Sequence, residues 1–352
     1  MKLFKSLLVA PATLGLLAPM SATANEVTIN DFNPAEELAV TNSRVDGLEA
    51  RLNNFEAGGF SETTTASFSV DAVIGAIDGD TTSEATTFDY QYNIGLSTSF
   101  TGEDSLDVAI DSGSSPTTND NPMAFDTGSS LVVDGVTYSF PVGGVSMIVG
   151  DATDISASFT GACTYSAFTD YMGDCGTGNS IGKGGNGVTA TGSYAFDSGF
   201  SLAAGLSSTK TDILTTEGTD SFGIEAAYTA DSYALAVAYI SDDNAADAET
   251  TTWGINGSYT FDSTSLPTIS VGYETVDATT DESGYFVGLT WPEVGPGSVS
   301  VGAATAGNFA DSATEYMIYE ASYSYPVNDG LTITPGVYIK ETSGDDLSLI
   351  HI

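Results

Sequence analysis

Residues 233–239 read Tyr-Ala-Leu-Ala-Val-Ala-Tyr, so large apolar side chains alternate strictly with alanine. Successive side chains of an extended chain point to opposite faces, and a period of two therefore predicts a β-strand with two different faces. The segments 86–96, 250–262 and 282–292 alternate in the same way. This pattern, rather than a helical one, decides the fold of most of the chain.

Outward from that stretch, the alternation extends from Phe60 to the end of the chain and predicts about 16 strands, many of about ten residues. Turn signals rich in Gly, Asn, Asp and Ser separate most of them. Short connections alternate with longer acidic ones such as 242–250 and 277–283. The expected strand cores are 63–75, 86–100, 104–111, 135–142, 144–151, 187–197, 199–208, 219–230, 232–241, 250–262, 266–276, 282–292, 296–306, 313–325 and 330–340, with a weaker one at 345–351.

The two faces of these strands favour a barrel over a soluble sandwich. One face is apolar and rich in Tyr, whereas the other carries Gly, Ala, Ser, Thr and scattered carboxylates in place of the mixed Lys, Arg and Glu of a water-facing sheet. Only a closed barrel satisfies every backbone group in lipid without helices. The fold class we expect is all-β, a transmembrane antiparallel β-barrel over 60–352, preceded by a short coiled-coil helix.

Composition excludes several classes of function. The 352 residues include 47 Asp+Glu and only 7 Lys+Arg, for a formal net charge of −40. Nucleic acid is therefore excluded as a partner, because phosphate binding needs clustered basic residues. His351 is the one histidine, which argues against a histidine-based zinc site or catalytic triad. We expect neither an enzyme nor a cofactor nor a bound metal.

The N-terminus resembles a secretory signal. Lys2 and Lys5 precede an apolar stretch, and residues 22–24 form an A-x-A cleavage site. The domains we expect are a signal peptide at 1–24, a linker at 25–33, a coiled-coil helix at 34–57 and the barrel from 60 onward. A membrane anchor is the weaker alternative, because the apolar stretch is short and the cleavage site is good.

Residues 34–57 form the one credible helix. Its apolar residues are spaced 7, 3, 4 and 3 apart, which is an a/d heptad pattern, and they are Leu38, Val45, Leu48, Leu52 and Phe55. One interpretation is a coiled-coil stalk that joins subunits outside the cytoplasm. The other is a single amphipathic helix that lies against the rest of the protein.

The polar faces of the strands supply the candidate functional residues. A ring of carboxylates in a narrow aqueous pore attracts cations and repels anions. The alternative is that these acids lie at the rim or in loops and only increase solubility, since a one-residue shift of register would turn each of them to the other face. The pore-lining candidates are Asp71, Asp89, Asp107, Glu225, Glu274 and Glu320, with Lys340 as the one basic residue.

The longest connection, 151–187, carries both cysteines, Cys163 and Cys175. Outside the cytoplasm such a pair can be oxidised, and we expect a disulfide between the two cysteines. The connection could fold into the mouth or lumen and constrict it, or it could be a mobile surface loop. Its glycine run at 182–187 lacks the Lys-Ser/Thr ending of a phosphate loop, so no nucleotide role is expected.

Four segments resemble recurring motifs of cyanobacterial outer-membrane porins, which are also known as iron-uptake or carbohydrate-selective porins. They are SFTGEDSL at 99–106, VTYSFPVG at 136–143, DGLTITPGV at 329–337 and the heptad segment RVDGLEAR at 44–51. The resemblance implies a barrel in the cell outer membrane, a homotrimer, and passage of small solutes and inorganic ions. This sequence departs from the family pattern in two ways. Only residues 25–33 stand where members carry a surface-layer-homology domain, and the chain ends in Leu-Ile-His-Ile rather than in an aromatic residue.

The function we expect is therefore that of an outer-membrane porin with an acidic lumen, through which small cations and small hydrophilic solutes, iron among them, diffuse passively. The main alternative is a non-conducting structural or surface-display barrel. An outer-membrane hydrolase and a secreted β-sandwich are further alternatives. The hydrolase would lack an interior base, and the sandwich would be extracted without detergent.

Overall fold

The computed structural model describes residues 64–78, 86–114, 123, 125, 128–178, 187–209, 213–215, 218–243, 249–310, 313–341 and 347–351. The expected signal peptide, linker and coiled-coil helix lie outside these residues. Within them, no helix has the length and apolar character that a membrane span requires. The described elements are β1 (Thr64–Asp78), β2 (Thr87–Thr98), β3 (Ser105–Gly113), β4 (Val132–Val142), β5 (Val145–Thr153), η2 (Ile155–Ser158), η3 (Asp170–Gly176), β6 (Gly187–Ala195), β7 (Phe200–Ser208), β8 (Asp220–Thr229), β9 (Tyr233–Asp243), β10 (Glu249–Tyr259), β11 (Thr268–Asp277), β12 (Glu282–Val294), β13 (Gly297–Thr305), β14 (Phe309–Ala310), β15 (Met317–Asn328), β16 (Leu331–Ile333), β17 (Gly336–Lys340) and β18 (Leu347–His351).

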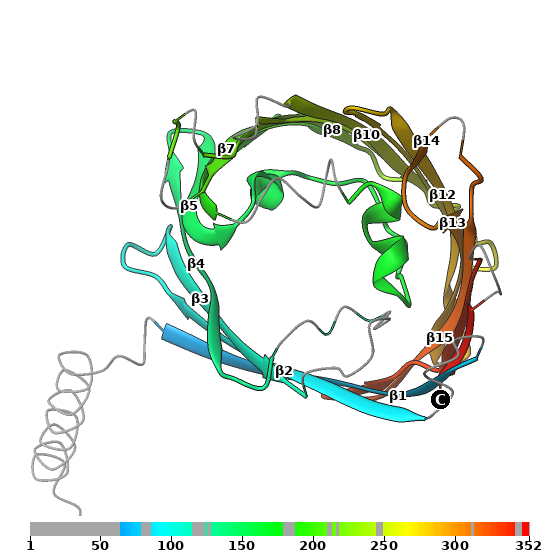
Figure 1. Ribbon diagram of the computed structural model, residues 1–352. Helices are drawn as coiled ribbons and strands as arrows, with labels where there is room; N and C mark the ends of the chain where they lie inside the picture. The colour runs from blue at the N-terminus through cyan, green and yellow to red at the C-terminus, as the bar shows by residue number, and fades with distance from the viewer. Residues whose placement is uncertain are drawn as a thin grey trace, which may run out of the picture. The chain divides into compact units, whose positions relative to one another are not determined.

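The described strands form a single antiparallel sheet of eighteen strands. Each strand from β1 to β12 pairs with the next, and the run then continues through β13, β15, β17 and β18. The short strands β14 and β16 add to β12 and β15 at the margin, which leaves sixteen strands in the continuous run. In Figure 1 the sheet is seen end-on and curves round an interior that contains the segment after β5.

The first and last strands meet over only part of their length. β18 pairs with β17 on one side and with β1 on the other, but the second ladder spans only Gly75–Asp78. β18 ends at His351, opposite Gly75. Among the described strands, none pairs with Thr64–Val73 on the side away from β2. The sheet therefore joins its two ends near one rim and leaves the rest of that boundary without a ladder.

The two faces of the sheet differ as the alternation predicts. On β8, Phe222 and Ile224 are exposed on the outer face, whereas Gly223, Glu225 and Ala227 are buried on the inner one. The same division holds on β11, where Val271 and Tyr273 are exposed and their neighbours are buried. Small inner residues let the interior segment approach the wall, and large outer residues leave a continuous apolar surface.

The expected strand at 330–340 is not continuous, because the structure divides it into β16 and β17, which both pair with β15. Pro335 lies at the break and has no N–H to donate into a ladder. Its carbonyl still accepts a hydrogen bond from the backbone N–H of Tyr323, at 2.9 Å. The sequence also did not indicate β14, which pairs Phe309 with Ser283 beyond the end of β13.

The two acidic connections are shorter than expected. β9 continues to Asp243 and β10 begins at Glu249, with these two residues paired in register. Likewise β11 ends at Asp277 and β12 begins at Glu282. Ladder hydrogen bonds are made by the backbone, so a strand can continue past the end of its apolar pattern into acidic sequence.

Aromatic pairs gather where the connections are short. Tyr194 and Phe196 lie where β6 enters one such turn, with ring centroids 4.7 Å apart. Phe200 follows the same turn and Tyr228 precedes the next short turn, and their ring centroids are 4.6 Å apart. Further pairs lie at or near other short turns, namely Phe100–Tyr138, Tyr228–Tyr233, Tyr259–Phe261 and Tyr323–Tyr325. The rim at this end of the sheet therefore carries a band of aromatic side chains.

The turn between β2 and β3 is held by one carboxylate. Asp104 accepts hydrogen bonds from the backbone N–H groups of Phe100 and Thr101, and from the hydroxyls of Ser99 and Tyr138, the last at 2.6 Å. These bonds, that from Tyr138 above all, hold the pKa of Asp104 well below its ordinary value. The ionised form therefore stabilises the turn.

We predict that Asp104→Asn lowers the temperature at which the folded protein unfolds at neutral pH, because an amide cannot accept all four bonds as a charged group does. A carboxyl with a depressed pKa stabilises the fold above its unfolded pKa, about 4, and that contribution fades as the pH falls towards the folded value. The difference from wild type should shrink below about pH 4. Heat-modifiable gel mobility at several pH values measures it. A difference that does not change with pH would contradict this assignment.

Candidate functional site

The segment 154–178 lies inside the curve of the sheet (Figure 1). It leaves the end of β5 through η2, crosses the interior as extended chain and forms η3. We call it the insert. The expectation that this connection enters the interior is thus met for its described part, and the expectation of a surface loop is not.

Polar side chains of successive strands hold the insert against the wall. Near its start, the backbone N–H of Thr160 donates to the carboxylate of Glu225 on β8. Further along, the N–H of Ala162 donates to Oδ1 of Asn256 on β10 at 2.8 Å. The amide nitrogen of the same asparagine donates to the hydroxyl of Thr177, at 3.1 Å. The insert therefore follows the wall instead of projecting freely.

Glu320 on β15 makes the densest of these contacts. Its carboxylate accepts from the backbone N–H groups of Phe168 and Thr169, at 2.7 and 3.0 Å, and from the hydroxyls of Thr169 and Tyr165, at 2.7 and 3.0 Å. The residue is only 3% exposed. Burial, and then the charge of Glu320, raise the pKa of Tyr165, which stays a donor.

A disulfide and an apolar cluster complete the packing of the insert. Cys163 and Cys175 are bonded to each other and close a loop round the Glu320 contacts. Met172 and Cys175 are fully buried, together with wall residues Phe286 and Ile318. At Gly272 on β11 a Cβ would overlap the carbonyl of Cys175, so only glycine lets the insert approach this closely. This half of the insert has a defined shape.

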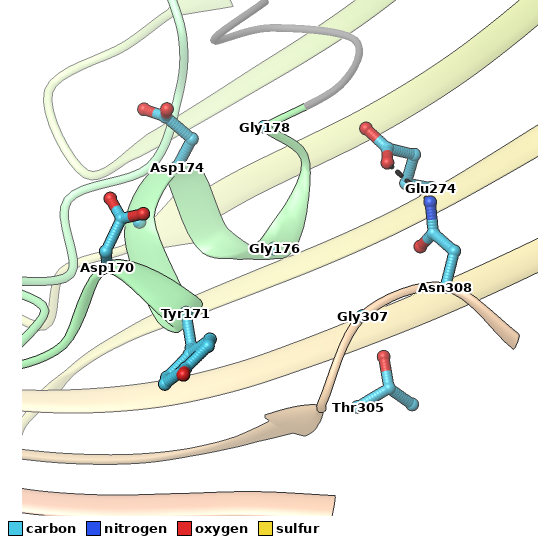
Figure 2. A pocket seen from close by; sticks show the side chains of 10 residues that line it. Asp170, Tyr171, Asp174, Gly176, Gly178, Glu274, Thr305, Gly307 and Asn308 are labelled. Carbon is cyan, nitrogen blue, oxygen red and sulfur yellow. Dashed lines mark hydrogen bonds between the residues drawn. The ribbon is translucent and has the colours of Figure 1, made fainter. Parts of the chain in front are cut away.

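A pocket of about 270 Å³ lies between η3 and the wall, and Figure 2 shows its lining. Asp170 and Asp174 line it from η3, and Glu274 lines it from β11 beside Asn308, whose amide donates to Glu274 Oε1 at 2.8 Å. Desolvation by the surrounding protein, and then the charges of Asp170 and Asp154, raise the pKa of Asp174. Within the described residues, no group of three or more His, Cys, Asp or Glu is arranged to hold a metal ion.

The seven pore-lining candidates share the inner face but not the same surroundings. Glu225, Glu274 and Glu320 are at most 3% exposed, beneath or beside the insert. Lys340 lies with its Nζ 4.2 Å from the ring centroid of Tyr171 on the insert. These four side chains therefore contact other protein groups rather than the open interior.

The remaining candidates lie on β1 to β3, which the insert does not cover. Asp71 accepts a weak 3.5 Å bond from Gln91, Asp89 accepts from Ser114 at 2.9 Å, and Asp107 accepts from Ser105 at 2.9 Å. The register aligns odd-numbered residues of these strands with one another, so the three carboxylates share one face. Asp71 is well exposed there, whereas Asp89 and Asp107 are partly buried.

Sequence reasoning missed the acids Asp170 and Asp174 of the insert. It also missed Asn256, which binds the insert, and Asn308, which binds Glu274. Asp170 and Asp174 lie outside any alternating pattern, so no periodicity indicated the face or direction of their side chains. Asn256 stood on the expected inner face, but an amide there has no partner until the insert is in place. The position of the insert was the missing information.

We predict that Glu320→Ala frees the second half of the insert, because four donors lose their acceptor and each buried unmade bond costs about 1–3 kcal/mol. If the protein conducts, its single-channel current should become larger and noisier. Glu293→Gln, an exposed change at the end of β12, is the control and should leave the trace unaltered. A quiet, unchanged current in Glu320→Ala would show that the carboxylate does not hold the insert.

Three solved or curated proteins resemble this one in fold or sequence. A triple mutant of the porin of Rhodopseudomonas blastica superposes with a TM-score of 0.51 at 14% identity, covering 82% of this chain and 98% of that one. A loop-deletion variant of OmpT, an outer membrane protein of Vibrio cholerae, gives a TM-score of 0.57 at 12% identity and the same coverage. An uncharacterized protein of Nostoc sp. (strain PCC 7120) is 32% identical over 157 residues, which are 39% of this chain but only 27% of that protein.

At such low identity the two solved structures establish the fold alone. The family is established by the sequence, because the model of the Gram-negative porins matches residues 63–346. That range spans the whole sheet as far as the start of β18 and includes the insert. The chain therefore belongs to the Gram-negative porin family.

Proposed function

We propose that the protein is an outer-membrane porin through which small hydrophilic solutes and inorganic ions diffuse passively, with cations favoured. Membership of the porin family supports diffusion without chemistry, so no catalytic residue is assigned. The OmpT relative is an outer membrane protein, which supports the same location here. In this proposal the N-terminal signal at 1–24 exports the chain, and the heptads at 34–57 join three copies. The resemblance to cyanobacterial porins supports a homotrimer and the passage of iron or carbohydrates.

The outer face supports a membrane location for the sheet. Large apolar side chains are exposed along it, among them Phe68 at 72% and Ile224 at 57%, and burial in lipid would remove them from water. The aromatic pairs at the short turns match the girdle that transmembrane barrels place at a bilayer interface. In the proposed barrel the boundary between β1 and β18 is part of a continuous wall.

The insert displaces the proposed passage to one side of the interior. It packs against β6 to β15, where the inner residues are buried, and leaves β1 uncovered, where Ser67, Ser69 and Asp71 are exposed on the inner face. Solutes would therefore pass between the insert and the wall formed by β1 to β4. The carboxylates of Asp71, Asp89 and Asp107 line that side.

The single observation that supports the cation preference is the balance of acidic and basic side chains among the described residues. Lys340 is the only basic side chain among the described residues, and it lies against Tyr171. Carboxylates occupy both sides of the proposed passage, on β1 to β3 and on η3. Low-dielectric walls focus such a field and raise the local concentration of cations.

We predict that reversal potentials across planar bilayers in a KCl gradient show K⁺ preferred over Cl⁻ by about fivefold or more at 0.1 M salt. Combined Asp71→Asn, Asp89→Asn and Asp107→Asn should bring the ratio close to one. The matched control removes three exposed turn charges instead, through Asp197→Asn, Asp231→Asn and Asp262→Asn, and should change the ratio little. Anion preference in the wild type, or equal effects of the two triples, would refute the proposal.

Salt dependence gives a second readout. The screening length shrinks from about 10 Å at 0.1 M to about 3 Å at 1 M, so the preference should weaken as salt rises. A preference set by pore width alone would not respond in this way.

The main alternative is a structural or surface-display barrel that does not conduct. The observation that favours it is the insert itself, which occupies part of the interior and is fixed there by a disulfide and many hydrogen bonds. The bilayer experiment separates the two functions. Silence from folded wild-type protein, together with steps from Glu320→Ala, would support the closed alternative.

We predict that the protein leaves isolated membranes only with detergent and runs faster on gels before boiling than after it, because a folded barrel resists dodecyl sulfate at room temperature. Release by salt or alkali alone would favour a secreted sandwich.

A further inference from the structure

One cross-strand pair of the wall receives the disulfide-bonded part of the insert. Asn256 on β10 and Gly272 on β11 lie directly opposite each other in the ladder. Gly272 leaves room for the carbonyl of Cys175, which a Cβ at this position would overlap. One pair further along β11, the hydroxyl of Ser270 lies 3.1 Å from that of Thr164. We call these three wall residues the cradle, and its shape follows the loop that the disulfide closes.

Asn256 contacts both ends of that loop. Its Oδ1 accepts from the backbone N–H of Ala162, directly before Cys163, at 2.8 Å. Its Nδ2 donates to the hydroxyl of Thr177, two residues after Cys175, at 3.1 Å. One amide can make both bonds only while the two ends lie close together, and the disulfide keeps the Cα atoms of the two cysteines 5.8 Å apart.

The chain between the disulfide and Thr177 has the left-handed backbone conformation. The φ angles of Asp174, Cys175 and Gly176 are +49°, +54° and +68°, and of these three residues only glycine adopts such angles readily. The hydroxyl of Thr177 donates to the carbonyl of Asp174, which leaves its lone pairs to accept from Asn256. When Cys175 is released, rotation of this turn to ordinary negative φ moves Thr177 away from Asn256.

The insert therefore fits the cradle differently in the two redox states of its cysteines. A buried amide that loses a partner keeps the cost of its desolvation, so a loop whose ends have separated docks less tightly than one whose ends are joined. Docking in turn makes the disulfide harder to reduce, because coupling between two equilibria is reciprocal. Cys175 is fully buried whereas Cys163 is partly exposed, so a reagent reaches the bond at Cys163.

We propose that Asn256 and Gly272 form a redox-sensitive latch that holds residues 162–177 against the wall only while Cys163 and Cys175 are joined. The latch rests on contacts between the insert and the wall and not on ion conduction. Its failure is therefore distinguishable from failure of the proposed cation preference.

A dithiol opens the latch. Its thiolate attacks Sγ of Cys163, the bond to Cys175 breaks, and the Cys175 thiolate takes up a proton. The second thiol of the dithiol then attacks the mixed disulfide and releases Cys163, which is protonated in the same way. The protein gains two electrons and two protons, and the dithiol loses them and leaves as a cyclic disulfide.

The test is hydrogen–deuterium exchange of the full-length protein, folded in detergent, with and without dithiothreitol. Reduction should speed the exchange of peptides from 162–177 by about tenfold, the effect of losing one buried hydrogen bond. Peptides of β8 and β9 should exchange as before. Alkylation and mass spectrometry report how far the two cysteines are reduced.

Variants separate the latch from the closed loop itself. In oxidised Asn256→Ala the same peptides should already exchange about tenfold faster than in wild type, and reduction should add less than about threefold. Thr177→Val, which leaves the wall unchanged, should give the same result. Asn93→Ala removes an amide from β2 instead and should keep the full response to dithiothreitol.

A further variant controls for the reagent. Combined Cys163→Ser and Cys175→Ser should exchange like reduced wild type and should not respond to dithiothreitol. Heat-modifiable gel mobility shows that each variant still folds.

Three results would overturn the proposal. Equal exchange of 162–177 in oxidised and reduced wild type would show that the insert docks without the disulfide. A full response to reduction in both Asn256→Ala and Thr177→Val would show that the disulfide acts on the loop alone. A disulfide that dithiothreitol leaves intact in the folded protein would remove the switch.

Discussion

The rest of the structure depends on the pairing of backbone N–H and C=O groups along the strands. A sheet whose outer face is apolar has no water there to satisfy these groups, so the ladder has to do so. Strand pairing therefore continues into acidic sequence at Asp243 and Glu249, past the end of the apolar pattern. At Pro335, which has no N–H to donate, the run from Leu331 to Lys340 divides into β16 and β17.

The insert follows the opposite principle, because side chains rather than backbone ladders hold it. Carboxylates and amides on the inner face accept from backbone N–H groups of the insert, which would otherwise be buried without partners. Glu320 alone satisfies four donors. Small residues such as Gly272 provide the space, and the disulfide keeps the second half in one shape. Acidic residues on the covered half of the wall thus have a structural role, while Asp71 on β1 is exposed on the inner face.

This division gives the interior two unlike sides. The half under the insert is packed and buried, whereas Ser67, Ser69 and Asp71 on the inner face of β1 are exposed. The proposed passage of cations lies on the side of these exposed residues, with the carboxylate of Asp71 on its wall.

The sequence by itself determined the strands, their two faces and the sign of the charge, because a period of two and a deficit of Lys and Arg are local properties. It also placed Glu225, Glu274 and Glu320 on the inner face, but not beneath other protein. Which carboxylates are covered and which acids of 154–178 line the pocket were decided only by the tertiary structure. These depend on contacts between residues far apart in the chain, such as Thr169 with Glu320, and no local pattern carries that information.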